Sequence, residues 1–533
     1  RKPISLPPPT AMNSSSEFFK RKERFKLPSE NAVFDNTPGP VETVFIRSIH
    51  WLSLRMIRWH GFNSWNPIVL FISFILYLID GAWSGLDREY FVKRRALYGD
   101  TFATVMSINI SKLDASARAP DSLDARLTTI PQRRGFFLGA TLVNRAHVPI
   151  STDKKRSLSL LHLSDSSVEY KGQKPWLNSH DQYRSTVMAN FIGGDKRREA
   201  IARQKSEVAA KLLSDAAAAL EGKKDKTEAY DVVASFLIRY YQHVLFGIPP
   251  EAAREDLLNA AFFAGTRYVF YLYGPNWLWS WVLYPVFCWH SLAKTLKEVK
   301  AHWAKSSPVL KDFDGAAQDG QAKGKPLKHA PVSLEEFTDQ LEMLVGIAAL
   351  QGTLALALNC LYQMPEGFAD SHATDEAEIR AAVLECARLD TPVTGSHCIV
   401  NDAGGLNVTI GGTKYTVPVG TTLFLSCTLA NTDPKRFPEP YVFNPSRTGR
   451  APDELLSFHA VGETTNPAHP RICPGREIAQ QCVIDLVRAV AARRAGRAFT
   501  PTVAPQPERA AKGKRGANAR GSRSNTVRTQ QMH

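Results

Sequence analysis

The residue with the clearest chemical potential is Cys473, which lies in the stretch Arg-Ile-Cys-Pro-Gly-Arg at residues 471–476. A Gly-containing turn follows it, and the apolar run at residues 478–487 then predicts a helix. Backbone N–H groups and the positive end of a starting helix stabilise a thiolate at such a position. A thiolate there could be the axial ligand of a haem iron. A single cysteine in this setting is more often a buried free thiol, so the interpretation depends on other motifs.

Two upstream patches supply those motifs. Glu385 and Arg388 are three residues apart, so in a helix their charges share one face and can pair. The sequence after them runs into Pro392, which is typical of a helix that ends against a core. A Pro-rich meander then leads to Arg447. Arg447 could reach back to Glu385, which predicts a buried Arg–Glu–Arg cluster with a structural role.

The order of these motifs carries a family resemblance. E-x-x-R, about forty residues of strand, D-P-x-x-F-x-x-P-x-x-F-x-P-x-R and then C-P-G-x-x-x-A resemble the C-terminal third of a cytochrome P-450. The resemblance is close over residues 376–495 and traceable from about Asp87. It implies a mainly α haem-thiolate fold with a small β-region, here at residues 84–502. It also implies heme b (iron protoporphyrin IX), with Cys473 as the ligand of the iron.

The loop before the cysteine narrows the resemblance. The general pattern places a Phe seven residues before the Cys, but here Phe458 lies fifteen residues before Cys473. The longer loop contains Gly-Glu-Thr-x-Asn-Pro at residues 462–467 and is similar to the plant-type allene oxide synthase and hydroperoxide lyase branch. That branch rearranges fatty-acid hydroperoxides without dioxygen or a reductase.

The central helix departs from both known patterns. A monooxygenase of this fold carries an acid and an alcohol there for proton delivery. Thr353 could be the alcohol, but Gly352 stands where the acid is expected. The rearranging branch has an Asn that aligns with Ala348, and Gln351 could replace it or be an ordinary surface residue. The candidate catalytic residues are therefore Cys473, Ala348, Gln351 and Thr353.

A second set of residues could hold the cofactor's carboxylates. His180 and Arg184 are four residues apart and project from one helix face. The resemblance places this pair on a haem propionate, and Arg471 would be a third cationic partner. The candidate cofactor-binding residues are His180, Arg184, Arg471 and Cys473. By itself, His180 would more often be an ordinary surface or core histidine.

The N-terminal region is membrane-directed in character. Residues 1–40 are predicted to be a disordered, basic segment, and residues 41–83 an amphipathic helix followed by a hydrophobic anchor. Apolar residues recur there at helical spacing: Val41, Phe45, Ile49, Leu52 and Met56. The apolar run at residues 67–79 is shorter than the roughly 20 residues a bilayer span needs, so it predicts a short or tilted anchor, or a buried core helix. We expect an intracellular membrane such as the endoplasmic reticulum, with the catalytic domain facing the cytosol.

Composition limits the remaining classes of function. The seven cysteines follow residue 287 without a C-x-x-C pair, which favours thiols in a reducing compartment. The net charge is +15, but residues 503–533 read as a disordered basic tail that holds much of it. No nucleic-acid partner is therefore expected.

Three functions remain open. The favoured one is rearrangement of a fatty-acid hydroperoxide, with the membrane and a lipophilic small molecule as partners. The alternative is a membrane-bound monooxygenase acting on a lipophilic substrate, which alone would need a reductase. The third is a degenerate, non-catalytic haem protein.

Overall fold

The computed structural model describes part of the chain. The described residues are 37–58, 88–99, 101–103, 108–110, 195–259, 290–313, 349–392, 395–399, 406–418, 422–432, 437–448 and 475–497, with Ile68, Phe71, Ile72, Ile75, Pro434 and Phe499. Within them, helices outnumber strands and the strands form two small sheets. The predicted fold class, mainly α with a small β-region, is confirmed for these residues.

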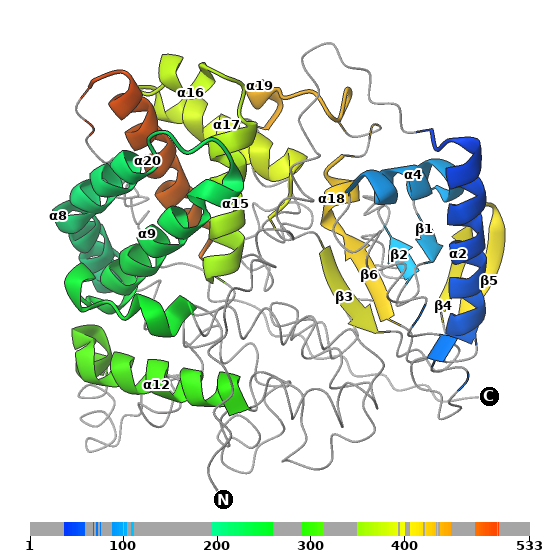
Figure 1. Cartoon of the computed structure of the whole chain (residues 1–533), viewed down its shortest axis with the longest axis horizontal. Helices are drawn as coiled ribbons and strands as arrows, with labels where there is room; N and C mark the ends of the chain where they lie inside the picture. The colour runs from blue at the N-terminus through cyan, green and yellow to red at the C-terminus, as the bar shows by residue number, and fades with distance from the viewer. Residues whose placement is uncertain are drawn as a thin grey trace, which may run out of the picture. The chain divides into compact units, whose positions relative to one another are not determined.

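Four helices pack on one another to form the main core (Figure 1). They are α8 (Asp195–Ala219), α9 (Lys226–Phe246), α15 (Leu350–Gln363) and α20 (Arg476–Arg494).

The sequence sets the ends of α9 locally. The Asp225 side chain accepts the backbone N–H groups of Thr227 and Glu228 at its start, and Gly247 ends it with φ 69°.

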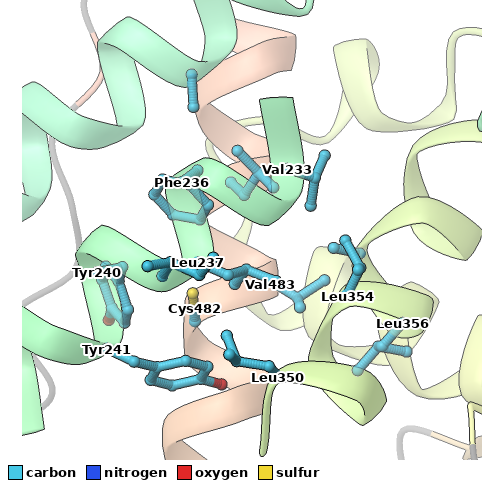
Figure 2. Close-up of a cluster of buried hydrophobic side chains, with 14 of the residues drawn as sticks. Val233, Phe236, Leu237, Tyr240, Tyr241, Leu350, Leu354, Leu356, Cys482 and Val483 are labelled. Carbon is cyan, nitrogen blue, oxygen red and sulfur yellow. The ribbon is translucent and has the colours of Figure 1, made fainter. Parts of the chain in front are cut away.

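The core between these helices is apolar and aromatic. Figure 2 shows the contributing side chains of α9, α15 and α20: Val233, Phe236, Leu237, Tyr240, Tyr241, Leu350, Leu354, Leu356, Cys482 and Val483. Their burial removes apolar surface from water and supplies the main driving force for packing the bundle. The rotation of each helix about its own axis is thereby fixed, which decides where its remaining side chains point.

Further helices lie outside this bundle. They are η10 (Pro250–Ala252), α12 (His290–Ser306), α16 (Phe368–Ser371), α17 (Glu376–Leu389), α18 (Cys427–Ala430) and α19 (Pro445–Thr448). Helix α17 contacts α15, α19 and α20, and it begins at Asp375, whose carboxylate accepts two backbone N–H groups. It ends at Leu389, three residues before Pro392, as the sequence predicts.

The strands form a four-stranded sheet in the order β1-β2-β6-β3 and a separate hairpin. The sheet contains β1 (Thr101–Ala103), β2 (Ile108–Ile110), β3 (Gly395–Ile399) and β6 (Thr422–Ser426), with β2 and β6 parallel and the other pairs antiparallel. The hairpin joins β4 (Leu406–Ile410) to β5 (Thr413–Val417). Gly411 and Gly412 have φ of 53° and 81°, which a two-residue hairpin turn requires, so the predicted Gly-Gly hairpin is confirmed.

Two helices precede the sheet, α2 (Pro40–Arg58) and α4 (Arg88–Tyr98), and α18 contacts both α4 and β3. The predicted helix after residue 40 is therefore confirmed, but part of its apolar surface is buried, including Ile49 and Met56. Most of the apolar run at residues 67–79 lies outside the described residues. In the part of the chain that the structure describes, no helix has both the length and the apolar character to cross a bilayer. The predicted N-terminal anchor thus has no structural support there.

Candidate active site

The candidate residues divide into two groups. Five lie outside the described residues, so their roles stay predictions: His180, Arg184, Ala348, Arg471 and Cys473. The other five are described and lie on three helices. Gln351 and Thr353 are on α15, Glu385 and Arg388 are on α17, and Arg447 is on α19.

Glu385, Arg388 and Arg447 come together in one cluster. Arg388 donates from Nη2 to Glu385 Oε1 at 2.7 Å and from Nε to Oε2 at 2.9 Å, and both side chains are fully buried. The Nε of Arg447 lies 3.5 Å from Glu385 Oε1, and its side chain is 14% exposed. The backbone N–H of Asn444 donates to the same oxygen at 3.0 Å. A carboxylate bound in this way is well compensated for its loss of water.

The cluster fastens α17 to the Pro-rich meander. Arg388 Nη1 donates to the carbonyls of Asn431 at 3.0 Å and Pro440 at 2.7 Å, and its guanidinium lies 5.1 Å from the ring centre of Phe437. Burial, and then the charge of Arg388, lower the pKa of Arg447 from its usual value. The meander that leads towards the cysteine loop is therefore held by buried charge-assisted bonds.

One backbone position in the meander is strained. Glu439 has φ 51°, a left-handed conformation that non-glycine residues rarely adopt. Its carbonyl accepts the N–H of Val442 at 3.0 Å and lies 3.4 Å from Arg447 Nη2. Arg447 therefore also stabilises the turn that carries the meander past α17.

Thr353 does not face an open part of α15. Its Oγ1 lies 2.7 Å from the phenolic oxygen of Tyr241 on α9, and both residues are buried. Leu350 and Leu354 beside it also belong to the core (Figure 2). The role of Thr353 as the catalytic alcohol stays a prediction; α15 is rotated so that this hydroxyl contacts Tyr241 on α9.

The half-buried face of α15 carries mostly small residues. In its first turns Gly352 and Ala355 lie on it with Gln351, and Thr353 is about 160° around the helix from Ala355. Among the described residues, none brings an atom within 4 Å of a Cβ built on Gly352. A mid-helix Gly costs roughly 0.5–1 kcal/mol relative to Ala, and no described neighbour requires it. A flat group could therefore approach this face closely.

A buried polar network, which the sequence analysis missed, joins three helix ends. Lys226 Nζ donates to Asn359 Oδ1 at 2.7 Å and lies 3.4 Å from Asp390 Oδ2. Asn359 Nδ2 donates to the Asp390 carbonyl at 2.8 Å, and Gln363 Nε2 to its carboxylate at 2.7 Å. The network fixes the end of α15 against the end of α17. A lysine in the first turn of a helix is usually exposed, so no pattern in the sequence indicates this network.

Comparison with known proteins gives limited matches. No family model matches the chain. A stretch of 103 residues, 19% of the chain, is 34% identical to the cytochrome P-450 monooxygenase drtD of Aspergillus calidoustus. The match spans only 17% of that protein's length.

Two solved structures illustrate the likeness in three dimensions. Epothilone B-bound cytochrome P450epoK is 16% identical, with 78% of this chain and 90% of that one covered and a TM-score of 0.48. Retinoic acid-bound cyanobacterial CYP120A1 is 15% identical, with 78% and 88% covered and a TM-score of 0.45. Sequence identities and TM-scores as low as these do not distinguish one enzymatic reaction from another.

The 103-residue match supports the predicted resemblance to the cytochrome P-450 superfamily and the thiolate-ligated haem that the resemblance implies. None of the proteins named above is an allene oxide synthase or a hydroperoxide lyase. The narrower branch therefore stays a prediction.

Proposed function

We propose that the chain is a haem-thiolate enzyme of the cytochrome P-450 type that acts on a lipophilic small molecule. The observation that carries this proposal is the buried cluster of Glu385, Arg388 and Arg447. The E-x-x-R and P-x-R motifs indicate these three residues from the sequence alone. Their union in one buried unit, together with the 103-residue match, supports the family to which the motifs point.

The described residues are compatible with the cofactor. Among the described residues nothing lies within 4 Å of a Cβ built on Gly352, so none of them keeps a flat macrocycle from approaching α15 there. Cys473 would hold the iron, and His180, Arg184 and Arg471 would neutralise the propionates. When bound, the haem supplies the iron chemistry that acts on an O–O bond.

The favoured reaction is rearrangement of a fatty-acid hydroperoxide. Use of dioxygen requires delivery of protons in the site, which is general acid work. Beside Gly352 on the half-buried face of α15, Gln351 and Ala355 offer no carboxylate and no hydroxyl. The hydroxyl of Thr353 is held by Tyr241, and that of Tyr362, two turns further along, donates to the Lys223 carbonyl. A hydroperoxide brings its O–O bond and its proton with it. Gln351, at the edge of this face, would orient the substrate with its amide.

Monooxygenation is the second candidate, and the drtD match favours it. In that case a reductase would be a partner, and a group outside the described residues would supply the proton. A non-catalytic haem protein would give neither reaction.

One experiment separates these outcomes. Purified full-length protein is incubated with linoleate hydroperoxide in the absence of NADPH, and products are identified by mass spectrometry. We expect conversion to an allene oxide, an aldehyde pair or an epoxyalcohol, and none with Cys473→Ser. If the protein instead hydroxylates a fatty acid only with NADPH and an added reductase, and does not convert hydroperoxides, its reaction is monooxygenation and not rearrangement.

The proposed setting is an intracellular membrane such as the endoplasmic reticulum, with the catalytic domain facing the cytosol. Among the described residues, Cys360, Cys386 and Cys482 are buried and form no disulfide, which fits a reducing compartment. The exposed apolar residues after α2, Ile68 and Phe71 among them, are suited to lipid contact.

A further inference from the structure

The inner face of helix α2 is fixed to the rest of the protein. Ile46, Ile49 and Met56 are fully or almost fully buried. His50 stacks on Tyr98 of α4, with ring centroids 3.7 Å apart. Since this face is packed, α2 cannot turn it towards lipid without losing that burial.

Two polar contacts also hold the ends of α2. Lys93 of α4 donates to Glu42 Oε1 at 2.9 Å near the start of the helix. The guanidinium of Arg58 lies 5.7 Å from the ring centre of Tyr415 on β5 at its end. The helix is thereby held along its length, which excludes an arrangement in which it stands upright in a bilayer.

The outer face of α2 has the opposite character. The exposed residues of this face lie on one side of the helix: Val41, Val44, Arg47, Ser48, Trp51 and Arg55. Val41 is 86% exposed, Val44 65% and Trp51 56%. The guanidinium of Arg55 lies 5.1 Å from the ring centre of Trp51. Glu42 is the only acidic residue of α2, and Lys93 pairs with it.

This combination matches the boundary of an anionic bilayer. Aliphatic side chains enter the outer acyl region, and Trp is favoured at the headgroup level, where its ring is both apolar and polar. Arginines beside them pair with lipid phosphates. A protein partner would also cover apolar groups, but the outward arginines Arg47 and Arg55, with a single acid on the helix that is already paired, select a negatively charged surface.

We infer that α2 is an interfacial docking helix. Its outer face lies flat on an anionic lipid leaflet while its inner face stays packed against α4 and β5. The inference rests on the membrane association proposed above and not on the reaction. It assigns to the predicted amphipathic helix a surface contact that fixes the orientation of the catalytic domain.

The test is vesicle co-sedimentation of the full-length protein with phosphatidylcholine vesicles that contain or lack phosphatidylserine. Wild type is expected to bind the phosphatidylserine vesicles more tightly. Arg47→Gln/Arg55→Gln should lower that affinity about thirtyfold. Trp51→Ala should lower binding to both vesicle types about tenfold. All the altered side chains are exposed, so folding should be retained in thermal unfolding.

Arg493→Gln/Arg494→Gln is the matched control, since it removes two exposed arginines from the end of α20. It should bind the vesicles like wild type. If the α2 variants bind like wild type as well, the inference is wrong while membrane association stands. If wild type binds neither type of vesicle, the inference about α2 and the proposed membrane association are both wrong. Turnover of a detergent-dispersed substrate should be the same in wild type and the α2 variants, which separates docking from the reaction.

Discussion

Replacement of Glu385 by Gln tests the buried cluster directly. The substitution keeps the shape of the side chain but removes the charge that faces Arg388, whose side chain has no exposed surface. The carbonyls of Asn431 and Pro440 still accept from Arg388, but no anion then compensates its charge. Loss of one partner of a buried ion pair costs about 3–5 kcal/mol, so the free energy of unfolding should fall by that amount.

The same helix offers a matched control. Glu376 also pairs with arginines, at 2.8 Å from Arg380 and 3.4 Å from Arg488, but these side chains are partly exposed. Glu376→Gln should therefore cost no more than about 1 kcal/mol. Urea unfolding of the two variants and wild type, with the yield of haem-loaded protein, gives the comparison. If Glu385→Gln unfolds like the control, or folds and holds haem but loses turnover, the structural role assigned to the cluster is wrong.

Three further outcomes are expected. Tyr241→Phe should lower the unfolding free energy by about 1 kcal/mol, since the Thr353 hydroxyl can turn back to a helix carbonyl, and Thr353→Val should leave product ratios unchanged; altered ratios would return Thr353 to the active site. Burial and then Arg94 lower the pKa of His50 to about 3, whereas the unfolded imidazole titrates near 6.5. Stability is therefore complete above pH 6.5 and lost as pH falls towards 3, by about 2 kcal/mol at pH 5, in urea unfolding; the His50→Phe variant should lack this loss. Cys473→Ser should abolish the thiolate-haem absorption spectrum, and a normal spectrum in that variant would exclude Cys473 as the ligand.

Much of the local structure could be predicted from the sequence because it depends on near neighbours. Glu385 and Arg388 meet because residues three apart share a helix face. Gly411-Gly412 makes a hairpin because both positions need positive φ, which glycine adopts without strain. The helix after residue 40 follows from its apolar spacing. The contact of Arg447 with Glu385 joins residues far apart in the chain, so the motifs allowed it and the tertiary structure decided it.

The tertiary structure alone decided which way these elements face. The pattern of α15 allows Thr353 to point to either side, and only packing against Tyr241, 112 residues away, turned it into the core. By its position in a first turn, Lys226 would be expected to be exposed. Its buried charge is compensated by Asn359 and Asp390, which lie far along the chain. Helix α2 shows the same division. Its sequence shows apolar residues at helical spacing with arginines elsewhere around the turn, but the packing of Ile46 and Ile49 decided which apolar residues remain exposed, because burial depends on partners that the local sequence does not contain.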